Sequence, residues 1–311
     1  MRVLMPALGH IRYNNHLHQG FLIDTFLRHG YDLVLYGPDV QHRRKGRVPV
    51  LWDPKRPFQR VVRTVRPDLI FWCYPRAKWL KRDWADLGDI PKVVYHSDFH
   101  YERHLRMFRG ADLVLLRAKT AAQDAERMKG RGGLGDVRWL PFSVDMPIVD
   151  SAPGVSARVP KVHFSGATQG EPYPARSAAL TALRRTGLLG DEYKHGYHSQ
   201  VLYYKALKRH MFALACTSAW DLTIAKHVEM LAAGCILLTD GGTGIDDLTG
   251  GNYFVYDHGQ SAPDLVLRIL RDPGLRRDAI AIASRGAEFV RKNHSHLVRG
   301  RQLCAQMEAL L

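Results

Sequence analysis

The charged side chains between residues 221 and 244 have types and spacing suited to binding a ligand. This stretch is DLTIAKHVEMLAAGCILLTDGGTG, which predicts a helix over 222–233, beginning near Thr223. Lys226 and Glu229 are three residues apart and project from one face of that helix. A glutamate near the carboxyl ends of parallel strands can accept hydrogen bonds from two vicinal hydroxyl groups, as acidic residues do with ribose. The alternative is an exposed Lys–Glu pair, with Asp221 only capping the helix.

Two further features predict contacts with an anion. The glycine-rich loop 241–244 follows a predicted strand over 235–240, and the backbone N–H groups of Thr243 and Gly244 could face an anion before the next short helix. Arg176 lies at the start of a predicted helix over 175–185, so its guanidinium and the helix terminus could act on one anion. The alternative for Arg176 is an ordinary surface residue.

Short apolar runs alternate with amphipathic stretches along the whole chain, which is typical of βαβ units and parallel sheets. The predicted strands are 2–6, 32–37, 69–74, 92–96, 111–116, 137–141, 161–166, 211–217, 235–240 and 253–257. The predicted helices are 16–29, 57–66, 99–109, 118–129, 175–185, 222–233, 262–272 and the stretch from about 275 to the end.

These elements predict an α/β protein with two Rossmann-like domains. We expect an acceptor-binding domain over 1–145, a linker over 146–160, a nucleotide-binding domain over 161–290 and a C-terminal helix over 291–311. The linker is predicted from a stretch rich in Pro, Ser and Gly that has no apolar periodicity. The last helix is long enough to pass back over the first domain.

Three blocks of the second half carry a family resemblance: SGATQGEPYPAR, KHVEMLAAGCILLTDGGTGIDDL and HSHLVRGRQL. They resemble the C-terminal half of GT-B glycosyltransferases, in particular the glycosyl transferases group 1 proteins, including the spore-maturation-type branch. That family carries an acidic residue, seven intervening residues and then Glu-x-x-Ala-x-Gly. Here Asp221 stands where many members have Glu, and Glu229 is the second acid. The resemblance covers roughly residues 160–311 and implies two domains that face a central cleft.

The resemblance also implies roles for individual residues. Glu229 would bind the ribose of a nucleotide-sugar donor, which we expect to be a UDP-sugar, and Asp221 would lie by the sugar or the diphosphate. Lys226 and Arg176 would contact the diphosphate, so the chain is expected to need no metal and no other cofactor. In such enzymes the loop over 6–15 faces the cleft, which makes Gly9 a candidate on the donor side and His10 one on the acceptor side.

An acceptor hydroxyl must lose its proton as it attacks the sugar. His96 and Asp98 follow the predicted strand over 92–96, at an edge where cleft residues collect. If the reaction inverts the sugar configuration, Asp98 is our first choice of base and His96 the second. If it retains the configuration, as the resembling family usually does, the departing phosphate takes the proton. The alternative for Asp98 is the N-cap of the helix over 99–109.

Positive charge is concentrated in the first half of the chain. The net charge is +15 with a pI near 9.8, and residues 41–82 hold 13 Lys and Arg against two acidic residues. A helix is predicted to begin at Pro57, and Arg56, Arg60 and Arg63 fall on one face of it, while its valines can face the core. A surface of this sign attracts polyanions or anionic membranes, so the acceptor is expected to be anionic.

Several acceptors and functions fit that charge. Our leading prediction is hydroxymethylated DNA bases of the bacteriophage type, which requires DNA binding and a base flipped from the stack. Anionic lipids or cell-envelope polymers are the alternative acceptors. A nucleic-acid-binding protein without catalysis and a nucleotide-sugar epimerase are the competing functions. No stable protein partner is implied.

The cysteines and histidines show no metal-ligand spacing. Cys73, Cys216, Cys235 and Cys304 are scattered, which predicts reduced thiols in the core of a cytoplasmic protein. His294 and His296 are two residues apart and face different sides of a helix, so packing or hydrogen bonding is predicted for them. No apolar run approaches the length of a membrane span.

Overall fold

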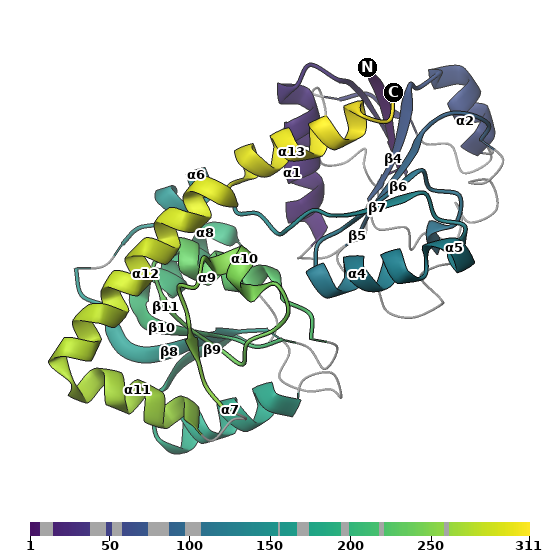
Figure 1. The fold of residues 1–311 in the computed structure, drawn as a ribbon. Coiled ribbons are helices and arrows are strands. Elements are labelled where there is room, and N and C mark those ends of the chain that lie inside the picture. Colours follow the sequence, from purple (N-terminus) through teal and green to yellow (C-terminus); the bar gives the residue numbers. More distant parts are fainter. Residues whose placement is uncertain are drawn as a thin grey trace. The chain divides into compact units, whose positions relative to one another are not determined.

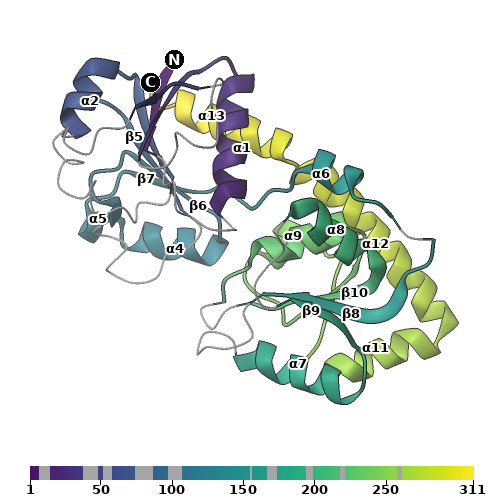
Figure 2. The same ribbon diagram turned by 180° about the vertical axis from the view of Figure 1, so that it is seen from behind.

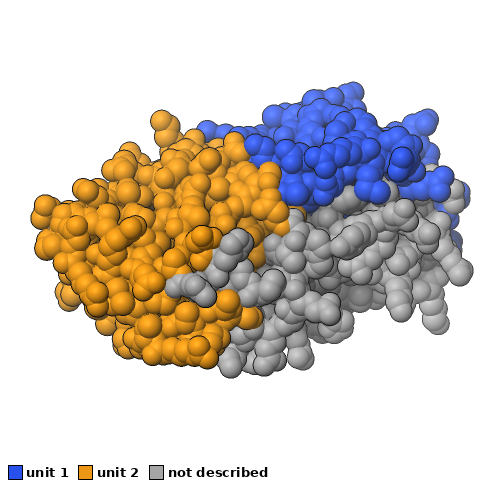
Figure 3. Space-filling view, turned by 60° about the horizontal axis from the view of Figure 1, so that its bottom comes forward, with its two compact units in different colours: residues 1–140, 299–311 blue, residues 141–298 orange. Residues whose placement is uncertain are grey.

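The computed structural model describes most of the chain. The described residues are 1–6, 15–37, 48–51, 58–73, 87–96, 107–154, 156–166, 174–193, 199–217, 221–257 and 261–311. They form two compact units (Figure 3). Unit 1 comprises residues 1–140 and 299–311, and unit 2 comprises residues 141–298.

Unit 1 is built on a parallel sheet in the order β3-β2-β1-β4-β5-β6-β7. Its strands are β1 (Arg2–Pro6), β2 (Asp32–Tyr36), β3 (Val50–Leu51), β4 (Leu69–Cys73), β5 (Lys92–His96), β6 (Leu113–Leu116) and β7 (Asp136–Trp139). Strands β4, β5 and β6 are buried along their whole length, as their apolar centres predict for the middle of a parallel sheet. Phe71 and Trp72 are therefore core residues.

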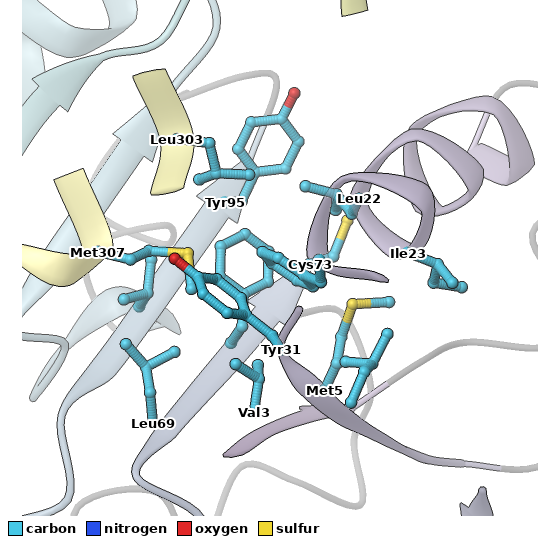
Figure 4. Close-up of a cluster of buried hydrophobic side chains, with 14 of the residues drawn as sticks. Val3, Met5, Leu22, Ile23, Tyr31, Leu69, Cys73, Tyr95, Leu303 and Met307 are labelled. Carbon is cyan, nitrogen blue, oxygen red and sulfur yellow. The ribbon is translucent and has the colours of Figure 1, made fainter. Parts of the chain in front are cut away.

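Helices cover this sheet (Figure 1). They are α1 (Asn15–Arg28), α2 (Phe58–Val65), α4 (Lys119–Arg127), α5 (Lys129–Gly132) and the C-terminal α13 (His296–Glu308). Helix α13 returns to unit 1 from Arg299 onward. Its Leu303 and Met307 pack among core residues that include Val3 and Tyr95 (Figure 4). A Cβ at Gly300 would lie 2.9 Å from Thr25 Oγ1, so the glycine permits the close approach of α13 to α1.

Unit 2 contains a second parallel sheet, in the order β12-β11-β10-β8-β9. Its strands are β8 (Val159–Ser165), β9 (Leu189–Tyr193), β10 (His210–Ala215), β11 (Ile236–Thr239) and β12 (Phe254–Val255). Its helices are α6 (Met146–Ser151), α7 (Pro174–Arg185), α8 (Gln200–Arg209), α9 (Ala225–Ala232), α10 (Ile245–Thr249), α11 (Ser261–Arg271) and α12 (Pro273–Asn293). Helices α8 and α9 lie on one face of the sheet, and α7 and α11 lie on the other (Figure 2).

The elements of unit 2 differ from the expected ones in three ways. The predicted linker contains α6, because Pro147 is tolerated in a first helical turn and both Met146 and Val149 are buried. Strand β9 and helix α8 were not predicted at all. Helix α9 begins at Ala225 with Ile224 at its N-cap position, three residues later than expected.

The described residues also answer two predictions about composition. All four cysteines are buried and free, which confirms that they are thiols of the core. No helix among the described residues combines the length and the apolar character needed to cross a membrane. Of the predicted helix over 99–109, residues 99–106 lie outside the described part.

Candidate functional site

The candidate ligand-binding residues of unit 2 gather at the carboxyl edge of its sheet. Strands β8, β10 and β11 are adjacent and parallel, so they end at the same edge. In open α/β sheets, ligands bind outside the carboxyl ends of the strands. Ser165 ends β8, and the loops after β10 and β11 lead into α9 and α10.

Glu229 lies on α9 and is bonded to a tyrosine of α8. The Tyr203 hydroxyl donates to Glu229 Oε2 at 3.0 Å. Glu229 is half-buried. The burial of Tyr203 and the nearby charge of Glu229 raise the pKa of the Tyr203 hydroxyl well above its ordinary value. Tyr203 therefore stays a hydrogen-bond donor, and its bond fixes the Glu229 carboxylate. Within the described part of the chain, no donor is bonded to Oε1. Sequence reasoning missed this residue because it missed α8.

Lys226 lies one turn before Glu229 but has other contacts. Its Nζ donates to Ser165 Oγ at 3.2 Å and lies 5.4 Å from the centre of the Tyr203 ring. Burial lowers the pKa of Lys226, and the Glu229 charge opposes that shift. Among the described residues, Lys226 and Glu229 form no direct ion pair. The alternative of a simple exposed Lys–Glu pair is therefore wrong, since both side chains are held in the site.

Arg176 brings a second cation to the same place. It is 4% exposed, so the alternative of an ordinary surface residue is also wrong. Its guanidinium lies 5.7 Å from the centre of the Phe164 ring, and Nη2 donates to the Cys216 carbonyl oxygen at 3.5 Å. A Cβ on Gly166 would lie 3.4 Å from Lys226 Cε and 3.9 Å from Arg176 Nη1. Both cations thus flank Gly166, whose φ of 144° favours glycine.

Asp221 connects the loop after β10 to the glycine-rich loop after β11. The backbone N–H of Thr243 donates to both Asp221 carboxylate oxygens at 3.1 Å, and the Thr243 hydroxyl donates to Oδ2. The N-cap position of α9 is occupied by Ile224 and not by Asp221. The prediction of Thr243 as a backbone donor to phosphate is also corrected, because its N–H is bonded to a carboxylate. Gly244 has a φ of 79° at the N-cap position of α10, and its role as a backbone donor to phosphate stays a prediction.

His227 makes hydrogen bonds near the same loops. Its Nε2 lies 3.1 Å from Thr239 Oγ1 and its Nδ1 lies 3.2 Å from the Ile224 backbone nitrogen. Gly241 N–H donates to Thr239 Oγ1 at 3.2 Å. Burial lowers the pKa of His227 to about 4, so the ring is neutral and one nitrogen donates while the other accepts. This network joins the start of α9 to the glycine-rich loop and was not predicted.

The predicted acceptor residues of unit 1 are described only in part. Arg60 and Arg63 are exposed on α2, while Val61, Val62 and Val65 are buried, which confirms the amphipathic pattern of this helix. His96 ends β5, is fully buried and has its ring centre 5.6 Å from that of Phe108. Four predicted site residues lie outside the described part of the chain: Gly9, His10, Arg56 and Asp98.

The C-terminal histidines have hydrogen-bonding and packing roles. His294 is buried and its Nε2 lies 2.9 Å from the Asp247 carbonyl oxygen. His296 Nδ1 lies 3.8 Å from Asp145 Oδ2. No group of three or more His, Cys, Asp and Glu side chains in the described part is arranged to hold a metal ion.

The site combines the Glu229 carboxylate, which Tyr203 holds in place, with the cations of Lys226 and Arg176, which lie beside Gly166. The carboxylate can accept hydrogen bonds from hydroxyl groups, and the cations can bind a phosphate or diphosphate. Such a set suits a ligand that carries both, and it lies within one unit of the chain.

One family model matches part of the chain. Residues 164–305 match the family model described as "glycosyl transferase-like", a range that contains every described site residue of unit 2. No curated protein matches the chain in sequence.

Solved structures share the fold over the whole chain. Sucrose-phosphate synthase from Thermosynechococcus elongatus is 12% identical with a TM-score of 0.70, covering 99% of this chain and 98% of that one. A glycosyltransferase from Rickettsia africae is 10% identical with a TM-score of 0.71 and the same coverage. Anabaena HepE in complex with UDP-glucose is 14% identical with a TM-score of 0.69, covering 99% and 100%. The chain therefore has the GT-B fold of two Rossmann-like domains.

Proposed function

We propose that this protein is a glycosyltransferase that transfers a sugar from a nucleotide-sugar donor to a hydroxyl group of an acceptor. The observation that carries the proposal is the convergence of Glu229, Lys226 and Arg176 at the carboxyl edge of the unit 2 sheet. This edge lies inside the segment that matches the glycosyl transferase-like model.

Each residue has a part in donor binding under this proposal. Glu229 accepts hydrogen bonds from the ribose hydroxyls, and Tyr203 already holds its carboxylate at 3.0 Å. Lys226 and Arg176 bind the diphosphate beside Gly166, where a side chain would fill the space between the two cations. Asp221 keeps the glycine-rich loop in place, so that Gly244 can offer its N–H to the donor. A UDP-sugar is our first choice of donor, supported by the HepE complex with UDP-glucose.

The chemistry follows from the leaving group. The acceptor oxygen forms a bond to the anomeric carbon as the bond to the nucleoside diphosphate breaks. Negative charge grows on the departing phosphate, and fixed cations that meet this charge lower the barrier. Lys226 and Arg176 supply two such charges, so we propose that transfer needs no metal and continues in the presence of EDTA. The acceptor proton passes to Asp98 or His96 in an inverting reaction, or to the departing phosphate in a retaining one.

For the acceptor we propose an anionic molecule, on the strength of the basic first half of the chain. Arg60 and Arg63 are exposed on α2 and suit contacts with phosphate groups. DNA with hydroxymethylated bases is the first choice, and a lipid or cell-envelope polymer is the alternative. A nucleic-acid-binding protein without transferase activity stays the competing function, because the same charge would serve it.

The donor proposal is tested by thermal shift with UDP, GDP, ADP, CDP and their sugar conjugates. We expect one nucleotide family to raise the melting temperature of the wild type and to have no effect on Glu229→Ala. Full activity of that variant with its best donor would remove Glu229 from the site. No stabilisation by any nucleotide, combined with salt-sensitive DNA binding, would favour the competing function.

The acceptor proposal needs a separate experiment. The best donor is incubated with hydroxymethylcytosine-containing DNA, with unmodified DNA and with anionic lipid acceptors, and the products are weighed by mass spectrometry. We expect transfer to the modified DNA and its selective loss in the double variant Arg60→Glu and Arg63→Glu. Transfer to lipid alone would replace DNA by the alternative acceptor.

A further inference from the structure

Tyr203 contacts two of the charged residues that we assign to the proposed donor, Glu229 and Lys226. Its hydroxyl donates to Glu229 Oε2 at 3.0 Å, and its ring centre lies 5.4 Å from Lys226 Nζ. The side chain therefore joins the proposed ribose-binding carboxylate to a proposed diphosphate-binding cation. It comes from α8, a helix that precedes both residues in sequence.

The placement of Tyr203 is fixed from several sides. Helix α8 begins with the Ser199 side chain accepting a hydrogen bond from the Leu202 backbone N–H at 3.3 Å. The Tyr203 ring lies 5.2 Å from the Tyr204 ring and 6.4 Å from the His163 ring, centre to centre. Tyr204 and His163 are themselves buried. A hydroxyl on such a braced ring has one defined position, so it can set the orientation of the carboxylate that it meets.

The contacts of Tyr203 also affect how Lys226 and Glu229 interact. Opposite charges three residues apart on a helix ordinarily attract each other and can pair directly. Here Lys226 bonds to Ser165 and lies over the tyrosine ring, whereas Glu229 bonds to the tyrosine hydroxyl. Each charged group is thus held away from the other. A carboxylate in a direct ion pair would offer fewer acceptor positions to a ligand.

We propose that Tyr203 is a positioning residue that orients Glu229 toward a ribose diol and so makes the site select ribonucleotide donors over deoxyribonucleotide donors. This inference rests on the proposed function. Each carboxylate oxygen has two acceptor positions. Oε2 can therefore accept from Tyr203 and from one ribose hydroxyl while Oε1 accepts from the other. A bidentate contact of this kind requires a carboxylate plane that does not rotate.

The experiment compares two ligands that differ only in the diol. Dissociation constants are measured by calorimetry for UDP, or for GDP, ADP or CDP if one of these binds tightest, and for its 2′,3′-dideoxy form. We expect the wild type to bind the ribonucleotide about tenfold or more tightly than the dideoxy form, the effect of losing hydrogen bonds to a charged group. Tyr203→Phe keeps the ring and removes the hydroxyl, and we expect it to weaken only ribonucleotide binding. The ratio between the two ligands should fall toward one.

A matched control separates this role from general loss of stability. Tyr253 also donates to a carboxylate at 3.0 Å, that of Asp246 in the same unit. Tyr253→Phe therefore removes the same kind of bond, and we expect the ligand ratio to stay at the wild-type value. Steady-state assays should show a higher donor KM for Tyr203→Phe with little change in kcat, since a contact present throughout the reaction is lost.

Failure of the Tyr203 role and failure of the proposed function would give different results. If the wild type discriminates against the dideoxy ligand and Tyr203→Phe keeps the full ratio, Tyr203 does not position Glu229 and the inference is overturned. If Glu229→Ala also keeps the ratio, the ribose contact itself is misassigned. If no nucleoside diphosphate binds the wild type, both the proposed function and this inference fail.

Discussion

The backbone N–H of Thr243 donates to both carboxylate oxygens of Asp221, at 3.1 Å each. Thr243 also forms a parallel bridge with Leu222, the residue that follows Asp221. Asp221 adopts a φ of 53°, a left-handed conformation that Asp tolerates better than most residues. A short acidic side chain thus holds two loops together at the edge where the proposed donor binds. This contact offers a reason for Asp at a position where many proteins of the resembling family carry Glu.

Asp221→Ala is therefore expected to loosen the glycine-rich loop. The variant loses the bonds to Thr243 and places a less tolerant residue at positive φ, so we expect about 1–2 kcal/mol less free energy of unfolding. Asp221→Asn keeps one acceptor oxygen and should lose less. Urea unfolding measures these differences, and donor KM should rise in the same order. Asp278→Asn, on the exposed surface of α12, removes a carboxylate elsewhere and should change neither quantity.

Asp221→Glu tests the family difference directly. The extra methylene displaces the carboxylate from its position beside Thr243. We therefore expect a loss of stability close to that of the alanine variant. A glutamate variant with wild-type stability and donor KM would mean that the length of this side chain is not important.

Replacing either cation should weaken binding of the diphosphate more than binding of the nucleoside. Lys226→Met and Arg176→Met keep much of the side-chain volume and remove the charge. We expect about tenfold weaker binding of UDP for each variant, the effect of a lost charge-assisted hydrogen bond, with little change for uridine. Calorimetry with both ligands measures the difference. Lys205→Met removes an exposed lysine of α8 and serves as control; an equal loss for UDP and uridine would contradict the assignment.

Two buried histidines should make the protein less stable as the pH falls. Burial lowers the pKa of His163 to about 3 and that of His227 to about 4, whereas an unfolded histidine titrates near pH 6.5. Between these values the unfolded state binds more protons than the folded state. The free energy of unfolding should then fall by about 1.4 kcal/mol per pH unit for each histidine as the pH drops below about 6.

The variants His163→Phe and His227→Gln check this pH dependence. Each removes one titrating group, so each should make the loss of stability between about pH 6 and pH 4.5 less steep. Urea unfolding at several pH values gives the slopes. Unchanged slopes in both variants would show that other groups dominate the acid sensitivity.

The thiols should be unreactive in the folded protein. Burial raises the pKa of Cys216 to about 12 and those of Cys235 and Cys304 to about 11, and it also raises the pKa of Cys73. The thiolate is the reactive form, so we expect almost no reaction with Ellman's reagent at mildly alkaline pH. All four thiols should react in strong denaturant. Rapid reaction of even one thiol in the native protein would contradict its buried position.

Much of the fold follows from local patterns in the sequence. The apolar runs within β4, β5 and β10 and the valine face of α2 depend only on the order of residues within each segment. Such patterns identify elements without knowledge of their neighbours. The placement of Lys226 and Glu229 on one helix face follows from the helical repeat. Helix α8 was not predicted because its apolar residues do not mark a single buried face. Two of them, Val201 and Leu202, are exposed.

The sequence by itself therefore determined the parallel α/β elements, the buried thiols, and a helix that carries a cation and a carboxylate three residues apart. Only the tertiary structure decided what those side chains contact. Tyr203 meets Glu229 across 26 positions, Lys226 meets Ser165 across 61, and Thr243 meets Asp221 across 22. The physical reason is that parallel strands bring distant segments to one edge through backbone pairing. The periodicity of a single segment carries no information about which segment lies beside it.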